Sequence, residues 1–171
     1  MRDRTRIALH ATASIGGLVV VGGLVAAGIA WRLEPAWLQV LAVAAIAAAG
    51  TAHGASVVTI VFRLADPPAS RLDAPGSEPR QQPDLAPPKN SMRGGWMIGV
   101  LERASTILAI TVAEPTIIAA IVAIKAVGRF GELAGDGQGA AARMRERFLV
   151  GSLASLTVAG LWGVAAWTLV R

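Results

Sequence analysis

The sequence WMIGVLERASTILAITVAEPTIIAAIVAIKAVGRF occupies residues 96–130 and is apolar over most of its length. A transmembrane helix needs about 20 apolar residues, because each residue adds about 1.5 Å across a hydrocarbon core of about 30 Å. This stretch is therefore long for one span and short for two. Glu114-Pro115 stands near its middle, and proline disfavours helix in the preceding residue and interrupts helical hydrogen bonding. The chain is predicted either to kink or to turn back there.

Three further apolar runs, at residues 7–31, 37–62 and 148–170, are each long enough to cross a bilayer. Hydrophobic residues make up 54% of the 171-residue chain and charged residues only 16%, which leaves little polar surface for a water-soluble domain. The sequence therefore predicts an all-α integral membrane helical bundle. The bundle has five membrane segments if residues 96–130 form a hairpin, and four if they form one kinked helix.

The first apolar run follows a basic start that contains Arg2, Arg4 and Arg6. Its last residues, Gly28-Ile29-Ala30, resemble a signal-peptidase cleavage site. The run is longer than the apolar part of a typical signal peptide, however, and the second run follows almost at once. We therefore expect an uncleaved helix, paired with the second run as an N-terminal transmembrane hairpin over residues 1–63.

Residues 64–95 differ in kind, because they carry seven prolines, charges of both signs and few apolar residues. No regular element tolerates such a proline density, and the segment cannot bury enough apolar surface to offset its chain entropy. We predict a disordered, proline-rich cytoplasmic loop. Residues 96–171 then form a C-terminal membrane region with a charged helical hairpin, a polar loop and a last transmembrane helix.

Basic residues gather at the N-terminus, in the central loop and over residues 125–147. Cytoplasmic loops of membrane proteins are enriched in Lys and Arg. A hairpin that turns at Glu114-Pro115 puts all three clusters on the cytoplasmic side, whereas one kinked span puts the last cluster outside. The distribution thus favours five segments in the cell inner membrane, with a cytoplasmic N-terminus.

The same hairpin brings charged side chains together at membrane depth. Counting outward from residues 114–115 places Glu102 within about 3 Å, along the axis, of the levels of Lys125 and Arg129. Charges at membrane depth almost always find partners, so Glu102 is expected to pair with one of these two cations. With Arg103 they form the candidate intramembrane charged cluster, which either anchors the helices or binds a substrate, ion or lipid headgroup.

His53 and Glu114 form the candidate polar core. His53 lies in the small-residue stretch 50–54, which lets another helix approach closely. A hydrogen bond between helices is favoured over a proton relay for this imidazole. The chain has two histidines and no cysteine, so the sequence predicts no metal site and no cofactor.

Small residues recur at every fourth position of the last run and predict a helix-packing face. The face consists of Gly151, Ser155, Ala159 and Gly163. Small side chains let two helix backbones approach closely inside a membrane. The partner is expected within the chain by default, or else in a second copy or another membrane protein.

The net charge of +5 at first suggests a nucleic-acid binder. The charges are scattered over segment ends, however, where Lys and Arg meet anionic lipid headgroups, so we expect no nucleic-acid partner. Catalytic motifs are also missing, and no enzyme is predicted. We expect an accessory or structural membrane component that packs with itself or with a partner. The alternatives are a small transporter or channel subunit that uses the charged cluster and His53, and a lipid-modifying membrane enzyme.

Three motifs in the C-terminal half occur in order: Gly99-Val100-Leu101-Glu102-Arg103, Lys125-Ala126-Val127-Gly128-Arg129-Phe130, and Leu149-Val150-Gly151-Ser152-Leu153-Ala154-Ser155. They resemble the Gly-x-Leu-Glu-Arg, Lys-x-x-x-Arg-Phe and Leu-x-Gly-Thr-x-x-Ser motifs of a bacterial multi-pass membrane family catalogued as domain of unknown function 3307. Ser152 stands where that family usually has threonine. The resemblance covers less than half of the chain. It implies that Glu102, Arg103, Lys125, Arg129 and Phe130 act as a unit, but it implies no particular chemistry.

Overall fold

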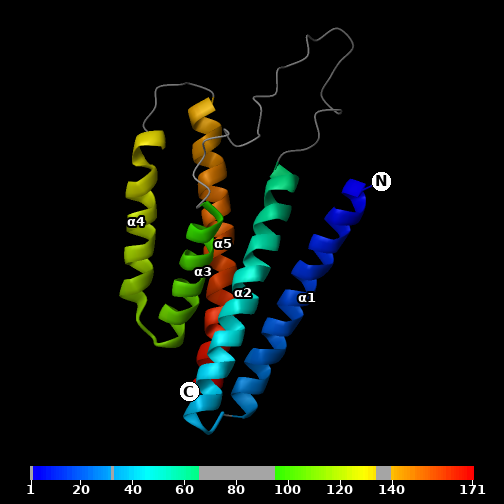
Figure 1. Cartoon of the computed structure of the whole chain (residues 1–171), viewed down its shortest axis with the longest axis vertical. Helices are drawn as coiled ribbons and strands as arrows, with labels where there is room; N and C mark the ends of the chain where they lie inside the picture. Colours follow the sequence, from blue (N-terminus) through cyan, green and yellow to red (C-terminus); the bar gives the residue numbers. More distant parts are fainter. Residues whose placement is uncertain (1, 32, 66–94, 134–139) are drawn as a thin grey trace.

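The computed structural model describes residues 2–31, 33–65, 95–133 and 140–171, and these residues are helical almost throughout. Side chains are described in these ranges except at 2–7 and 128–144. The described ranges hold five helices: α1 (Arg2–Ala30), α2 (Ala36–Ala65), α3 (Gly95–Thr111), α4 (Pro115–Leu133) and α5 (Ala140–Val170). The helices run up and down beside one another (Figure 1). The all-α prediction is confirmed. The disordered loop was predicted over residues 64–95; residues 66–94 lie outside the described residues, whereas 64–65 belong to α2 and Gly95 begins α3.

Three of the described helices are long and apolar enough to cross a membrane, over Ala8–Ala30, Ala36–Ala65 and Arg145–Val170. Large apolar side chains cover their outer faces. Val19, Val40 and Leu153 are about two-thirds exposed, at 70%, 68% and 65%. Contiguous apolar surface of this kind is rare on a soluble monomer. The fold is therefore compatible with an integral membrane protein.

Helix α5 forms the centre of the bundle and packs against α1, α2 and α3. The small-residue face predicted on α5 lies in these contacts and consists of Gly151, Ser155, Ala159 and Gly163. A Cβ atom at Gly163 would lie 2.8 Å from Ile110 on α3, and one at Gly151 would lie 2.5 Å from Phe62 on α2. A side chain at either position would therefore force its neighbour to shift, Ile110 at Gly163 and the tip of the Phe62 ring at Gly151.

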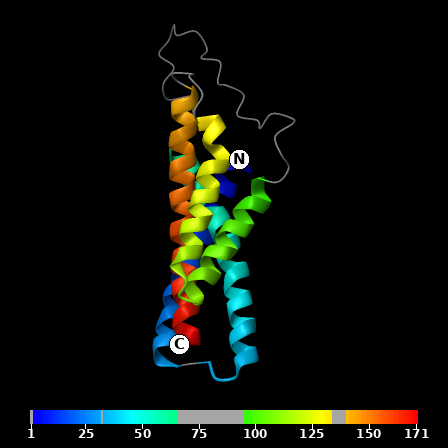
Figure 2. The ribbon, with the colours of Figure 1, turned by 90° about the vertical axis from the view of Figure 1, so that its left-hand side faces the viewer.

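Residues 96–130 turn back on themselves, as the hairpin interpretation predicts, and do not form one kinked helix. Helices α3 and α4 run in opposite directions on either side of a short turn (Figure 2). Pro115 is the first residue of α4, where its missing N–H leaves no helical bond unmade. The proline thus starts the second arm of the hairpin.

The turn is closed by a Schellman motif at the end of α3. The Glu114 N–H donates to the Ala109 carbonyl over 2.8 Å, and the Ala113 N–H donates to the Ile110 carbonyl over 3.0 Å. Ala113 adopts the left-handed conformation, with φ of 58°, which glycine would adopt at lower cost. The hydrogen bonds hold the alanine in this conformation.

The hairpin is shorter than the rest of the bundle. Its turn stops before the end where the α1–α2 connection and the C-terminus lie, as both views show (Figures 1 and 2). Helices α3 and α4 have 17 and 19 residues. At about 1.5 Å per residue they are about 26 and 28 Å long, slightly short of a full hydrocarbon core. The count of five membrane segments therefore stays a prediction.

Candidate functional site

A buried histidine at the centre of the bundle connects three helices. His53, on α2, is 7% exposed. Its Nδ1 accepts a hydrogen bond from Trp162 Nε1 on α5 over 2.9 Å, and its Nε2 lies 3.0 Å from the Ser14 carbonyl oxygen on α1. Because an indole N–H can only donate and a carbonyl can only accept, the imidazole is neutral and carries its proton on Nε2. This is the interhelical hydrogen bond expected of His53.

The imidazole is enclosed as well as hydrogen-bonded. Its ring meets the Trp162 ring edge to face, with centroids 5.9 Å apart and planes at 73°. On the α1 side, a Cβ atom at Gly17 would lie 2.6 Å from three atoms of the His53 ring. Glycine at position 17 therefore lets α1 approach closely enough for its Ser14 carbonyl to reach the ring.

Glu114 does not belong to this core, contrary to the expectation of a shared polar core with His53. It is exposed in the turn between α3 and α4, and its carboxylate accepts a hydrogen bond from the Thr116 hydroxyl. Glu114 lies in the middle of the apolar region 96–130, which suggested that it is buried deep in the membrane. The turn instead places this residue at the tip of the hairpin.

The hairpin arms are joined by an ion pair between Lys125 Nζ on α4 and Glu102 Oε2 on α3. The Lys125 and Glu102 side chains are 21% and 11% exposed, so most of the pair is shielded. The Lys125 ammonium also lies 5.8 Å from the centroid of the Phe148 ring on α5, a cation–π distance. The pairing agrees with the register counted from the turn, whereas the Arg129 side chain lies outside the described residues.

Arg103 is separated from this pair and faces α2 and α5. It is 8% exposed, and its Nη1 donates to Ser155 Oγ on α5 over 3.3 Å. A Cβ atom at Gly54 on α2 would lie 2.5 Å from Arg103 Cδ. The sequence prediction grouped Arg103 with its neighbour Glu102 and missed this burial. The small residues Gly54 and Ser155 were the available signal, because they leave room for a long side chain between helices.

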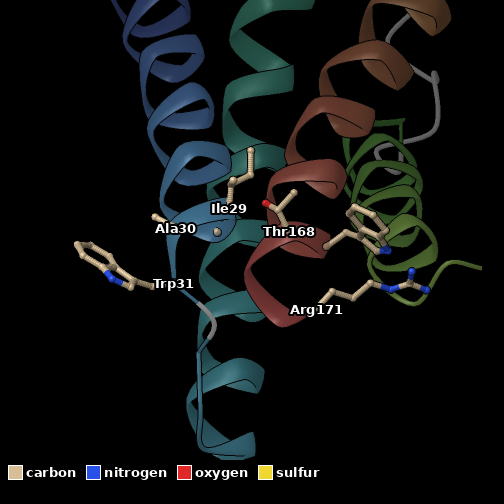
Figure 3. A pocket seen from close by; sticks show the side chains of 7 residues that line it. Ile29, Ala30, Trp31, Thr168 and Arg171 are labelled. Atoms are coloured by element: carbon tan, nitrogen blue, oxygen red, sulfur yellow. The ribbon is translucent and has the colours of Figure 1, made fainter.

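An open hollow of about 500 Å³ lies where α1 and α5 end, lined by Gly28, Ile29, Ala30, Trp31, Trp167, Thr168 and Arg171. The Trp31 and Arg171 side chains point away from it on opposite sides (Figure 3). The Arg171 guanidinium stacks over the Trp167 ring at 4.8 Å. Tryptophan and arginine at a helix end are typical of a membrane–water interface. We therefore interpret the hollow as part of the interfacial end of the bundle and not as a substrate cavity.

The described residues contain no group of three or more His, Asp or Glu side chains that could hold a metal ion. No family model, curated protein or solved structure matches the chain. The interpretation of the buried polar side chains therefore rests on their own geometry.

Proposed function

We propose that this chain is a small structural or accessory component of the bacterial cell inner membrane. The observation that carries the proposal is that buried polar side chains are used to hold helices together. His53 joins α1, α2 and α5, and the Glu102–Lys125 pair joins α3 to α4. A transport pathway needs polar groups that face a water-filled cavity, whereas these groups are bonded to one another.

The Glu102–Lys125 pair is also the point where the family resemblance meets the geometry. The Gly-x-Leu-Glu-Arg motif supplies Glu102, and the Lys-x-x-x-Arg-Phe motif supplies Lys125. An ion pair between two short arms explains why both motifs need a charge inside apolar sequence, since a charge at this depth requires a partner. Membership of that family, with the pair as a shared structural unit, is part of the proposal.

Five membrane segments and a cytoplasmic N-terminus are proposed for the topology. The start of α1, the ends of α2 and α4 and the start of α5 lie at one end of the bundle (Figure 1). The basic stretches of the sequence adjoin these same helix ends. The positive-inside rule places that end in the cytoplasm, next to anionic headgroups.

Cysteine labelling tests this topology without background, because the natural chain has no cysteine. A cysteine at Gln138 should react with a membrane-impermeant maleimide only after the cells are permeabilised. A cysteine at Glu34, on the opposite side, should react in intact cells. Labelling of position 138 in intact cells contradicts the five-segment topology.

The accessory role needs a surface for a second copy or a membrane partner, and α1 offers one. Space around Gly16, Gly22 and Gly23 is open, whereas Gly17 and Gly28 face the interior of the bundle. An outward glycine that faces only lipid contributes nothing to the stability of the bundle. The same glycine lets a second helix approach closely if one packs against it. We propose association through this outward face of α1.

Substitution of one outward glycine separates association from folding. Gly23→Leu should shift purified protein in nanodiscs or mild detergent towards the monomer, measured by light scattering or cross-linking. Ala44→Leu is the matched control, because Ala44 is exposed on α2 and lies on no glycine-rich face. Equal oligomeric states in wild type and both variants exclude this face as the contact.

A further inference from the structure

Arg103 is a buried arginine whose hydrogen bonds are not all made within the described part of the chain. The residue is 8% exposed, and its Nε has no hydrogen-bond partner there. Its hydrogen bond to Ser155 Oγ, at 3.3 Å, is long for a charged donor, which usually bonds at about 2.7–2.9 Å. The carboxylate of Glu102 acts on Arg103 electrostatically, but its ion pair is with Lys125. A guanidinium with an unsatisfied N–H at this depth is costly, so an external anion is the expected partner.

The surroundings of Arg103 provide an approach for such an anion from one direction. The three atoms nearest to a Cβ atom built at Gly99 would be Nη1, Nη2 and Cζ of Arg103, at 3.2, 3.6 and 3.7 Å. The guanidinium therefore extends along α3 towards the start of that helix. Gly95 lies one turn further on the same face, with no described atom within 4 Å of its Cβ position. Neither glycine places a side chain between the start of α3 and the guanidinium.

Other groups along this path also favour an anion. The first N–H groups of a helix such as α3 have no acceptor within the helix, and they lie at the positive end of the helix dipole. The Ser155 hydroxyl accepts from Arg103 and has a proton left to donate to a ligand. Arginine binds phosphate oxygens through its planar array of N–H donors.

We propose that Arg103 binds a phosphate oxyanion, with the Ser155 hydroxyl beside it and the Gly95–Gly99 face of α3 as the entry path. The inference rests on the proposed topology, in which the start of α3 is directed towards the cytoplasmic side of the membrane. The phosphate can belong to an anionic phospholipid or be free in solution. Both sources offer the same phosphate oxygens to Arg103. The experiment distinguishes them by adding either an anionic phospholipid or inorganic phosphate.

The test compares the full-length wild type with Arg103→Met in nanodiscs of phosphatidylcholine, with and without phosphatidylglycerol. Arg63→Met is the matched control, because Arg63 is an exposed arginine at the end of α2. The readouts are lipid retention by native mass spectrometry and the thermal midpoint. Phosphatidylglycerol affinity should fall at least about tenfold in Arg103→Met, since a charged hydrogen bond is worth that much, and stay nearly constant in Arg63→Met.

The stability readout should cross over between the two lipids. In phosphatidylcholine alone, Arg103→Met should melt above the wild type, because it removes a buried charge with an unsatisfied N–H. With phosphatidylglycerol, the wild-type midpoint should rise and the variant's should not. A rise on adding inorganic phosphate to phosphatidylcholine nanodiscs assigns the site to free phosphate instead of lipid.

Gly99→Ala provides a second variant that keeps the charge and crowds the entry path, and it should also weaken phosphatidylglycerol retention. The proposal is overturned if phosphatidylglycerol and phosphate both leave the wild-type midpoint unchanged, or if Arg63→Met loses as much lipid as Arg103→Met. Carbonate extraction distinguishes a failure of the proposed membrane position from a failure of the Arg103 site alone. A chain that is extracted contradicts the membrane position itself, and an inserted chain without lipid preference contradicts only the Arg103 site.

Discussion

Exchanging the charges of Glu102 and Lys125 tests whether this ion pair anchors the short hairpin. At about 4 Å and an effective dielectric constant of about 20, two unit charges attract by about 4 kcal/mol. Desolvation offsets part of this attraction. Because the side chains are 11% and 21% exposed, we expect a net coupling free energy of about 2–3 kcal/mol.

Each single substitution should lower the free energy of unfolding by more than the coupling free energy of the pair. Glu102→Lys leaves two cations facing each other, and Lys125→Glu leaves two carboxylates, so each should destabilise the fold by about 3–5 kcal/mol. The double variant Glu102→Lys/Lys125→Glu restores opposite charges. It should remain about 0.5–1 kcal/mol below the wild type, because glutamate cannot replace the cation that faces Phe148 at 5.8 Å.

The assay is equilibrium unfolding of purified protein in mixed micelles, by titration with sodium dodecyl sulfate and tryptophan fluorescence. The four free energies of unfolding form a double-mutant cycle. Glu114→Gln is the control on the same hairpin, because this exposed side chain keeps an acceptor for Thr116 and should leave stability unchanged.

A coupling free energy below about 0.5 kcal/mol would refute the anchoring role, because it would match an exposed pair on a soluble protein. Glu102→Gln adds a second criterion. A variant that keeps wild-type stability and assembly but loses a cellular phenotype would favour the transporter alternative over the structural proposal.

Three further substitutions test the packing and the turn, each by the same unfolding titration. Gly17→Ala should destabilise the bundle by about 1–3 kcal/mol, because the new Cβ atom meets the His53 ring, whereas Gly16→Ala points into open space and should be neutral or slightly stabilising. Trp162→Phe should cost about 1–3 kcal/mol, because it leaves the buried His53 Nδ1 without a donor; an unchanged midpoint contradicts the assigned tautomer. Ala113→Gly should stabilise the hairpin by about 0.5–1 kcal/mol, because glycine tolerates the left-handed turn, and a loss of stability argues against that backbone geometry.

The sequence was sufficient for features that depend on composition and spacing along the chain. Long apolar runs predicted the helices. Pro115 after Glu114 left a kink or a turn open, and the distribution of basic residues favoured the turn. Once the turn is known, helical rise converts residue counts into depth and limits the partner of Glu102 to Lys125 or Arg129, of which the structure shows Lys125. The small-residue spacing of the last run likewise predicted its packing face.

Features that depend on how each helix is rotated about its axis required the tertiary structure. A soluble helix reveals its buried face by its apolar stripe, but these helices are apolar on nearly every side. Lipid is as apolar as the bundle interior, so burial leaves little periodic signal in the sequence. The contact between His53 and Trp162, 109 positions apart, and the burial of Arg103 between Gly54 and Ser155 therefore appear only when the helices are packed. The depth of the hairpin and the exposure of Glu114 follow from the same packing.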